Sequence, residues 1–258
     1  MQIFILYEIN PLSNKQQWIR EVKKDYPNSK IVYIFTNIID EHRKWRIEQI
    51  NRHRELYDLI LTFNEKDAEQ YNMDYYEGVF SSVQVSRRLI DDAEMSDVYF
   101  CGLDKGRLPF LLDIYKYLTS NGVKCIFDII FADESRKEEH EGIQYHEDLI
   151  NNQAMLARVI KSKCILEAMV DTTQPGSSLR MCEAVAFKKK LLTNNPFAKD
   201  KPFFSSKQMQ YYSDATDIDI SFIYKELGES DFLDDHMLSP MKLLDYMERK
   251  LVKNEFDR

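Results

Sequence analysis

The segment from Gln174 to Asn195 places small hydroxyl side chains directly before a predicted helix. Pro175 and Gly176 interrupt the preceding segment, and the hydroxyl group of Ser177 or Ser178 can cap the helix that follows. The first turn of a helix carries unpaired N–H groups and a partial positive charge. Because Gly176, Ser177 and Ser178 are small, an anion can approach these N–H groups closely. The sequence therefore predicts a phosphate-binding site at this helix N-terminus.

Two charged residues of the same predicted helix, Arg180 and Glu183, lie at the edge of its apolar stripe. One interpretation is an ion pair at spacing i, i+3 on a solvated flank, which stabilises a helix by only about 0.2 to 0.5 kcal/mol. The other interpretation is a half-buried carboxylate that binds a ligand. The residue types leave both interpretations open.

A glycine-containing loop at residues 102–107 provides a second set of groups that could bind an anion. Gly102, Lys105 and Arg107 follow an apolar strand predicted around residues 98–101, and Pro109 opens the helix behind them. Cations before a helix N-terminus are disfavoured by up to about 1 kcal/mol, and a bound anion would remove this conflict. The alternative is an ordinary surface loop, where such charges are weakly penalised. The loop has neither the Walker A pattern nor full GxGxxG spacing, so it predicts neither an ATPase nor a dinucleotide dehydrogenase.

The elements that must position these groups alternate between strand and helix, which predicts an α/β fold. In the N-terminal half, the carboxyl ends of successive predicted strands lead into Glu8, Asn10, Thr36 and Asn37. Ligands bind at the carboxyl ends of strands in parallel sheets, so these side chains are candidates by position. The predicted strands are 3–7, 31–35 and 58–63, and the predicted helices are 15–26 and 40–57.

The length and composition of the chain restrict the class of protein. With 258 residues, the chain is long for one domain and short for two full ones, so two modest domains are predicted. A net charge of -8 argues against a general nucleic-acid binder. Four single cysteines within apolar runs predict buried thiols, with neither a disulfide nor a metal site. The apolar run 3–6 is too short for a signal peptide or a membrane span, so we expect a cytoplasmic protein.

Three segments resemble a known family. Nucleotide-sugar glycosyltransferases with the GT-B fold have a signature of Glu-Ala-small-Ala followed by an apolar strand. This chain has a similar pattern at residues 183–186 and 190–195. The 102–107 loop is similar to a Gly-x-Asp-Lys-Gly-Arg loop, and residues 57–71 resemble the close of the N-terminal domain, in small bacterial capsular or lipopolysaccharide biosynthesis glycosyltransferases. The resemblance implies two small Rossmann-like domains with parallel sheets facing across a cleft. It divides the chain into an acceptor domain (1–92), a nucleotide-sugar domain (93–238) and a C-terminal helix (239–258) that crosses both.

The resemblance also implies roles for particular residues. Glu183 would bind the donor ribose, and backbone groups of Ile143 to Tyr145 would hold the base. Many retaining members carry another glutamate eight residues before the ribose-binding one, where this chain has Pro175, so an inverting or a retaining outcome stays open. The implied donor-binding residues are Gly102, Lys105, Arg107, Ile143, Tyr145, Gly176, Ser177, Ser178, Arg180 and Glu183; the acceptor-binding residues are Asn10 and Asn37; and Glu8 is the candidate catalytic base.

The expected function is transfer of a sugar from a nucleotide diphosphate sugar, with a UDP-sugar as the expected donor, to a growing, lipid-linked surface polysaccharide. Cations and a helix N-terminus would stabilise the departing diphosphate, so we expect a metal-independent enzyme without a cofactor. Its partners would be the donor, a glycan or lipid-linked acceptor and the inner face of the membrane, but no nucleic acid. The alternative is a noncatalytic nucleotide-binding regulatory or partner subunit of a glycan-synthesis complex.

Overall fold

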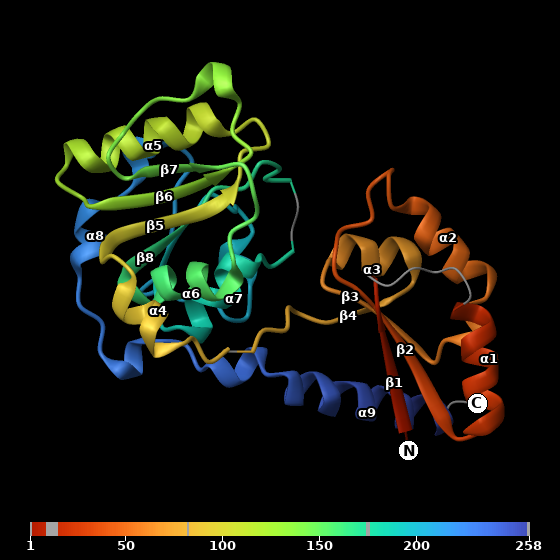
Figure 1. Ribbon diagram of the computed structural model, residues 1–258. Coiled ribbons are helices and arrows are strands. Elements are labelled where there is room, and N and C mark those ends of the chain that lie inside the picture. The colour runs from red at the N-terminus through yellow and green to blue at the C-terminus, as the bar shows by residue number, and fades with distance from the viewer. Residues whose placement is uncertain (1, 9–14, 82, 174–175, 257–258) are drawn as a thin grey trace. The chain divides into compact units, whose positions relative to one another are not determined.

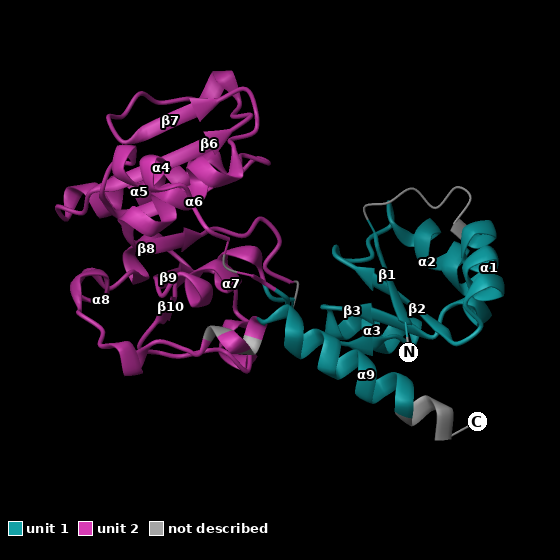
Figure 2. Ribbon diagram, turned by 60° about the horizontal axis from the view of Figure 1, so that its bottom comes forward, with its two compact units in different colours: residues 1–79, 175–177, 239–258 teal, residues 80–174, 178–238 magenta. Residues whose placement is uncertain are grey.

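The computed structural model describes residues 2–8, 15–81, 83–173 and 176–256 (Figure 1). The chain forms two compact units, each built around its own parallel β-sheet (Figure 2). This confirms the α/β fold class that the sequence predicts. Unit 1 contains residues 1–79, 175–177 and 239–258, and unit 2 contains residues 80–174 and 178–238.

Unit 1 has a four-stranded parallel sheet in the order β1-β2-β3-β4. The three strands predicted from the sequence are present, and a short fourth strand pairs with β3. The predicted helix at 40–57 is shorter, because Asp40 accepts a hydrogen bond from the Arg43 backbone N–H in a turn that precedes it. The elements are β1 (Gln2–Tyr7), α1 (Lys15–Asp25), β2 (Ser29–Phe35), α2 (Lys44–Arg52), η1 (Arg54–Leu56), β3 (Leu59–Thr62), α3 (Glu65–Tyr71) and β4 (Asp74–Tyr75).

The C-terminal helix α9 (Pro240–Phe256) completes unit 1. Strands that follow one another in a single direction, joined by right-handed crossovers, place their helices on one face of the sheet. Accordingly, Ile31, Tyr33 and Phe35 of β2 pack in one cluster with residues of α1 and α2. The alternate residue Val32 packs in another cluster with Leu243, Met247 and Leu251 of α9. Without α9, the second face of this sheet would be exposed to water.

Unit 2 has a six-stranded parallel sheet in the order β10-β9-β8-β5-β6-β7. From β5 the chain proceeds to one edge through β6 and β7, then crosses back to β8 and proceeds to the other edge. This is the doubly wound order of a Rossmann fold. The strands are β5 (Ser96–Leu103), β6 (Cys125–Ile130), β7 (Ile143–His146), β8 (Ser162–Glu167), β9 (Lys190–Thr193) and β10 (Met209–Tyr211).

Helices cover both faces of the unit 2 sheet (Figure 1). Residues of α5 and α8 pack with one set of strand side chains, and residues of α6 and α7 pack with the alternate set. The helices are α4 (Arg87–Asp92), α5 (Leu108–Ser120), α6 (Asn152–Lys161), α7 (Leu179–Ala186) and α8 (Ile220–Tyr224), and the single turns are η2 (Glu134–Arg136), η3 (Ala198–Asp200), η4 (Ala215–Asp217), η5 (Glu229–Asp231) and η6 (Asp235–Leu238).

The units differ from the division expected from the sequence at three places, one of which is the assignment of Gly176 and Ser177 to unit 1. Residues 80–92, assigned above to the first domain, belong to unit 2, where α4 lies against α6. The C-terminal helix belongs to unit 1, where the Tyr246 hydroxyl donates to the Tyr75 carbonyl oxygen (3.1 Å). Lys250 also pairs with Asp74 (2.6 Å). These contacts fix α9 against β4.

All four cysteines, Cys101, Cys125, Cys164 and Cys182, are buried in unit 2. Burial raises the pKa of the Cys101, Cys125 and Cys164 thiols. In the part of the chain that the structure describes, no helix has both the length and the apolar character needed to cross a membrane.

The role of α9 gives the first prediction. Met247 is fully buried against the unit 1 sheet, so Met247→Ala should destabilise unit 1 by about 2 to 5 kcal/mol. Both tryptophans, Trp18 and Trp45, are in unit 1, so denaturant unfolding followed by tryptophan fluorescence reports this unit. Met241 on the same helix is 64% exposed, and Met241→Ala is the control, expected to change stability by less than about 0.5 kcal/mol. Equal effects of the two substitutions would show that α9 does not cover the sheet.

Candidate functional site

The reversal of strand order in unit 2 lies between the adjacent strands β5 and β8. The chain leaves β5 toward α5 on one face and leaves β8 toward α7 on the other face. In parallel α/β sheets, such a topological switch point is where ligands bind. Five polar residues gather around it, and we call them the switch-point cluster: Arg107, Glu167, Ser178, Arg180 and Glu183.

Arg107 joins the two strands at the switch point. Its Nε and Nη2 atoms donate to the Leu103 carbonyl oxygen at the end of β5 (3.0 and 2.7 Å). Its Nη1 atom donates to the Ala168 carbonyl oxygen, directly after β8. Burial lowers the pKa of the Arg107 guanidinium. These contacts use three of the five guanidinium N–H groups.

Gly102 makes room for this guanidinium. A Cβ atom at Gly102 would lie 2.5 Å from Nη2 of Arg107, closer than van der Waals contact allows. The Arg107 guanidinium also lies over the Phe100 ring, 5.1 Å from its centroid. Gly102, a donor-binding residue in the sequence prediction, therefore positions Arg107 in the structure.

Arg180, in the first turn of α7, crosses the switch point from the opposite side. Its Nη2 atom donates to the Cys101 carbonyl oxygen of β5 (3.0 Å), and its Nη1 atom pairs with Glu183. The Glu183 side chain is only 5% exposed and the Arg180 side chain is 23% exposed, so this i, i+3 pair is partly buried and does not lie on a solvated flank. Burial raises the pKa of the Glu183 carboxyl, and Arg180 opposes this rise. Burial also disfavours the charged Arg180 guanidinium, but Glu183, together with Cys101 and Tyr99, raises its pKa overall.

Glu167, the last residue of β8, belongs to the cluster although sequence reasoning missed it. The residue is 3% exposed, and Thr193 donates to its Oε2 atom from β9. Within the described residues, its buried Oε1 atom has no hydrogen-bond partner. Burial raises the pKa of the carboxyl, against the opposing effects of Ser178, Thr193, Arg180 and Arg107. The available signal was a glutamate inside the apolar run 164–169, where a carboxylate is unusual.

The Gly-Ser-Ser segment divides between the two units. The Ser178 hydroxyl accepts from the Met181 backbone N–H (3.1 Å), so Ser178 is the N-cap of α7, one of the two predicted caps. Gly176 and Ser177 belong to unit 1. A Cβ atom at Gly176 would lie 2.6 Å from the Phe63 ring, and the Ser177 hydroxyl donates to Glu77. Pro175 and Gln174 lie outside the described residues.

The remaining donor-side candidates lie at different places in unit 2. Lys105 is exposed, with a left-handed backbone (φ 49°), in the turn between β5 and α5. Ile143 is buried in β7. The Tyr145 hydroxyl donates to the Glu138 carbonyl oxygen (2.8 Å) and accepts from the Glu138 backbone N–H (3.1 Å). The Ile143 and Tyr145 side chains therefore lie along β7 and do not extend beyond its carboxyl end.

In unit 1, Glu8 and Asn37 lie together at the carboxyl ends of β1 and β2. Glu8 is 3% exposed, and its Oε2 atom accepts from the backbone N–H groups of Thr36 (3.1 Å) and Asn37 (2.9 Å). Its Oε1 atom lies 3.7 Å from Arg43 Nε and 3.9 Å from Arg46 Nε. These contacts hold the Glu8 side chain against the loop after β2. The Asn10 candidate lies outside the described residues.

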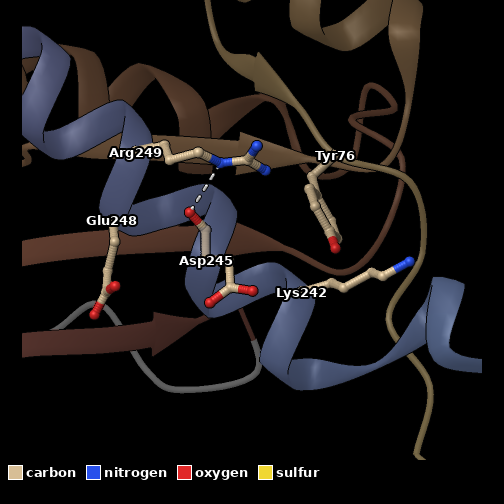
Figure 3. Close-up of a pocket in the computed structure, with 5 residues that line it drawn as sticks. All are labelled: Tyr76, Lys242, Asp245, Glu248 and Arg249. Carbon is tan, nitrogen blue, oxygen red and sulfur yellow. Dashed lines mark hydrogen bonds between the residues drawn. The ribbon is translucent and has the colours of Figure 1, made fainter.

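A surface hollow in unit 1 lies between α9 and the segment after β4 (Figure 3). Four of its five lining residues are charged, and the side chains point in different directions, so they do not converge on one ligand position. Arg249 Nε donates to the Asp245 backbone carbonyl oxygen within α9 (3.3 Å). The lining residues are Tyr76, Lys242, Asp245, Glu248 and Arg249.

No protein-family model and no curated protein matches the chain. Solved structures do match. A UDP-forming α,α-trehalose-phosphate synthase from Burkholderia xenovorans, in complex with glucose-6-phosphate, has a TM-score of 0.53 at 11% identity, covering 96% of this chain and 73% of that one. The apo structure of OtsA has a TM-score of 0.53 at 11% identity, covering 98% and 69%.

A third similar structure is a complex of accessory secretory proteins 1, 2 and 3 of Streptococcus pneumoniae. Its TM-score is 0.57 at 13% identity, covering 99% of this chain and 54% of that one, so the chain spans about half the length of this neighbour. At such identities, structural likeness shows the fold, which is of the GT-B type.

The packing around Arg107 gives a prediction for Gly102. A methyl group at this position displaces the guanidinium from the Leu103 and Ala168 carbonyl oxygens, so Gly102→Ala should destabilise unit 2 by about 1 to 3 kcal/mol. The control is Gly228→Ala, where the added Cβ atom meets only an ordinary contact at 3.7 Å. Differential scanning calorimetry measures the stability of both variants. If Gly102→Ala is as stable as the control, the guanidinium accommodates the methyl group without losing these contacts.

The burial of Glu167 gives a prediction for pH dependence. Since its pKa is raised in the folded state, the stability that it contributes is present at low pH and is lost as the pH rises through the folded pKa. Glu167→Gln should therefore stabilise the protein at pH 7 by about 1 to 3 kcal/mol, and the gain should disappear at pH values below about 4. Denaturant unfolding across this range, with the exposed Glu226→Gln as control, measures the difference. A gain that does not change with pH would contradict this prediction.

Proposed function

We propose that unit 2 binds the diphosphate of a nucleotide sugar at the switch-point cluster and that the protein transfers the sugar to an acceptor. The observation that carries this proposal is the pair of arginines that cross the switch point from opposite sides. Arg107 extends from the N-cap of α5 to the end of β8, and Arg180 extends from α7 to β5. Their mutual repulsion lowers the pKa of Arg107 further, so an anion between them would be favoured.

The same groups suit the chemistry of glycosyl transfer. Negative charge develops on the departing diphosphate, and positive groups that are already oriented stabilise this charge without reorganisation. Arg107 and Arg180 are held by carbonyl oxygens, and Lys105 is exposed beside them in the β5–α5 turn. These three cations and the α7 N-terminus capped by Ser178 support a metal-independent reaction.

The donor in this proposal is a UDP-sugar, with Glu183 accepting a hydrogen bond from the ribose. The fold supports this choice, since one structural neighbour is a UDP-forming synthase. The acceptor would be a glycan, soluble or lipid-linked, bound by unit 1 near Asn37. Glu8 is the proposed base by position, but its hydrogen bonds to Thr36 and Asn37 favour a role in positioning the acceptor loop.

A second candidate function is a noncatalytic nucleotide-binding subunit of a glycan-synthesis complex. Two observations favour it. The chain resembles a component of the accessory secretory protein complex. Pro175 also stands where many retaining family members carry a glutamate.

Turnover separates the two candidates. Purified protein incubated with a panel of nucleotide sugars, without acceptor, is assayed by mass spectrometry for donor hydrolysis. An enzyme releases a nucleoside diphosphate from one donor, and Arg180→Ala abolishes this release. Ligand-dependent thermal stabilisation without any product supports the noncatalytic subunit. If no donor stabilises the protein and no donor gives a product, both functions are refuted.

Lys105 provides a direct test of the diphosphate site. Its side chain is exposed, so Lys105→Ala should leave the fold intact while removing a cation aimed at the diphosphate. Affinity for UDP should fall about 2- to 10-fold, and affinity for uridine should stay unchanged. Calorimetric titration with both ligands measures this, with Lys116→Ala, an exposed lysine within α5, as the control. Equal losses for UDP and uridine would show that Lys105 does not face the diphosphate.

A further inference from the structure

Phe131, the residue directly after β6, combines a left-handed backbone with an exposed aromatic ring. Its φ is 54°, and 57% of the residue is exposed. A bulky side chain adopts this conformation rarely, because its Cβ atom crowds the backbone. Exposure of the ring also forgoes the stability that burial of a phenylalanine provides. Two unfavourable features at one residue call for a compensating function.

The other non-glycine residues with positive φ in the described part of the chain have ordinary reasons for it. Asn72 is the C-cap of α3, and asparagine tolerates this conformation. Lys188 directly follows the C-cap of α7, where left-handed residues commonly end a helix. Lys105 precedes Gly106 in a tight turn. Neither its residue type nor a helix end accounts for Phe131.

The neighbouring strands hold the Phe131 backbone in place. Its N–H group donates to the His146 carbonyl oxygen at the end of β7 (2.8 Å). On either side of it, Ile130 O accepts from the Asp104 N–H (2.9 Å) and the Asp133 N–H donates to Asp104 Oδ2 (3.1 Å). Asp104 is 4% exposed, and its Oδ1 atom accepts from the N–H group of Leu108 in α5 (2.7 Å). Phe131 is therefore fixed beside the loop that carries Lys105 and Arg107.

Other apolar side chains are exposed at the same edge of the unit 2 sheet. Leu149 follows β7 and is 72% exposed, Val170 follows β8 and is 54% exposed, and Leu179 begins α7 and is 67% exposed. The carboxyl edge thus presents apolar groups around a cationic centre. A ligand with an anionic part and a flat, uncharged ring matches this pattern. A nucleoside diphosphate has both parts.

We propose that the Phe131 ring is the stacking surface for the base of the nucleotide whose diphosphate binds at the switch-point cluster. This inference rests on the proposed function. Base stacking on an aromatic ring needs no particular hydrogen bonds, so it applies to any nucleobase. It places the base contact at the end of β6, in place of the backbone groups of Ile143 to Tyr145 in β7.

The test separates the ring from the backbone. Phe131→Asn removes the ring but suits a left-handed backbone, and Phe131→Tyr keeps an aromatic ring. UDP, GDP and ADP are titrated first against the wild-type protein, and the tightest of them is then compared with ribose 5-phosphate and inorganic pyrophosphate. Phe131→Asn should weaken the nucleotide about 5- to 150-fold, the range expected for loss of one stacked base. It should leave pyrophosphate and ribose 5-phosphate unchanged, and Phe131→Tyr should retain nucleotide affinity.

Thermal melting provides a second readout. Relief of the backbone strain should leave the melting temperature of Phe131→Asn unchanged or raised, even though its nucleotide affinity falls. If wild type binds a nucleotide and Phe131→Asn binds it equally well, the stacking inference is wrong while the proposed function stands. If the substitution weakens pyrophosphate as much as the nucleotide, Phe131 supports the loop and does not contact a base. If wild type binds none of the nucleotides, the proposed function itself fails.

Discussion

The guanidinium of Arg107 lies on carbonyl oxygens from both strands that flank the reversal in strand order of unit 2. The rest of the site depends on this placement. Gly102 has no side chain because the guanidinium occupies the space where its Cβ atom would lie. Arg180 makes the reciprocal contact from α7 to β5, and Glu183 compensates its charge. Buried cations are costly unless they are paired, so the cluster must be charge-compensated before any ligand binds.

The sequence predicts the parts of the site that follow local rules. Ser178 caps α7 because a hydroxyl before a helix accepts an N–H group, and the cations of residues 102–107 follow a strand and precede a helix. Glu167 was not predicted, because its importance comes from β9 and the two arginines, which are distant in sequence. The placement of Gly176 and Ser177 with unit 1 was not predictable either, since their partners, Phe63 and Glu77, lie about 100 residues away.

Some features of the fold are likewise determined by local sequence, and others by residues that are distant in sequence. Apolar runs identify the strands, because buried parallel strands are apolar on both faces. The membership of α9 in unit 1 depends instead on the strand order β1-β2-β3-β4, which leaves one sheet face without a helix from the connecting segments. The sequence predicts a C-terminal helix within residues 239–258, but local periodicity does not identify the sheet that the helix covers.

The hydrogen bonds of Asp104 connect α5 to the segment after β6, which carries Phe131. The Asp104 carboxylate accepts hydrogen bonds from N–H groups of α5 and of the segment after β6, so it joins the loops that follow β5 and β6. Phe131 is then held in a conformation that a free phenylalanine disfavours. A ring that had to be ordered at the moment of binding would lose part of its binding free energy to conformational entropy. In the site that we propose, the folding of unit 2 would supply this order, so the strained backbone of Phe131 and the carbonyl contacts of Arg107 would both act as preorganisation.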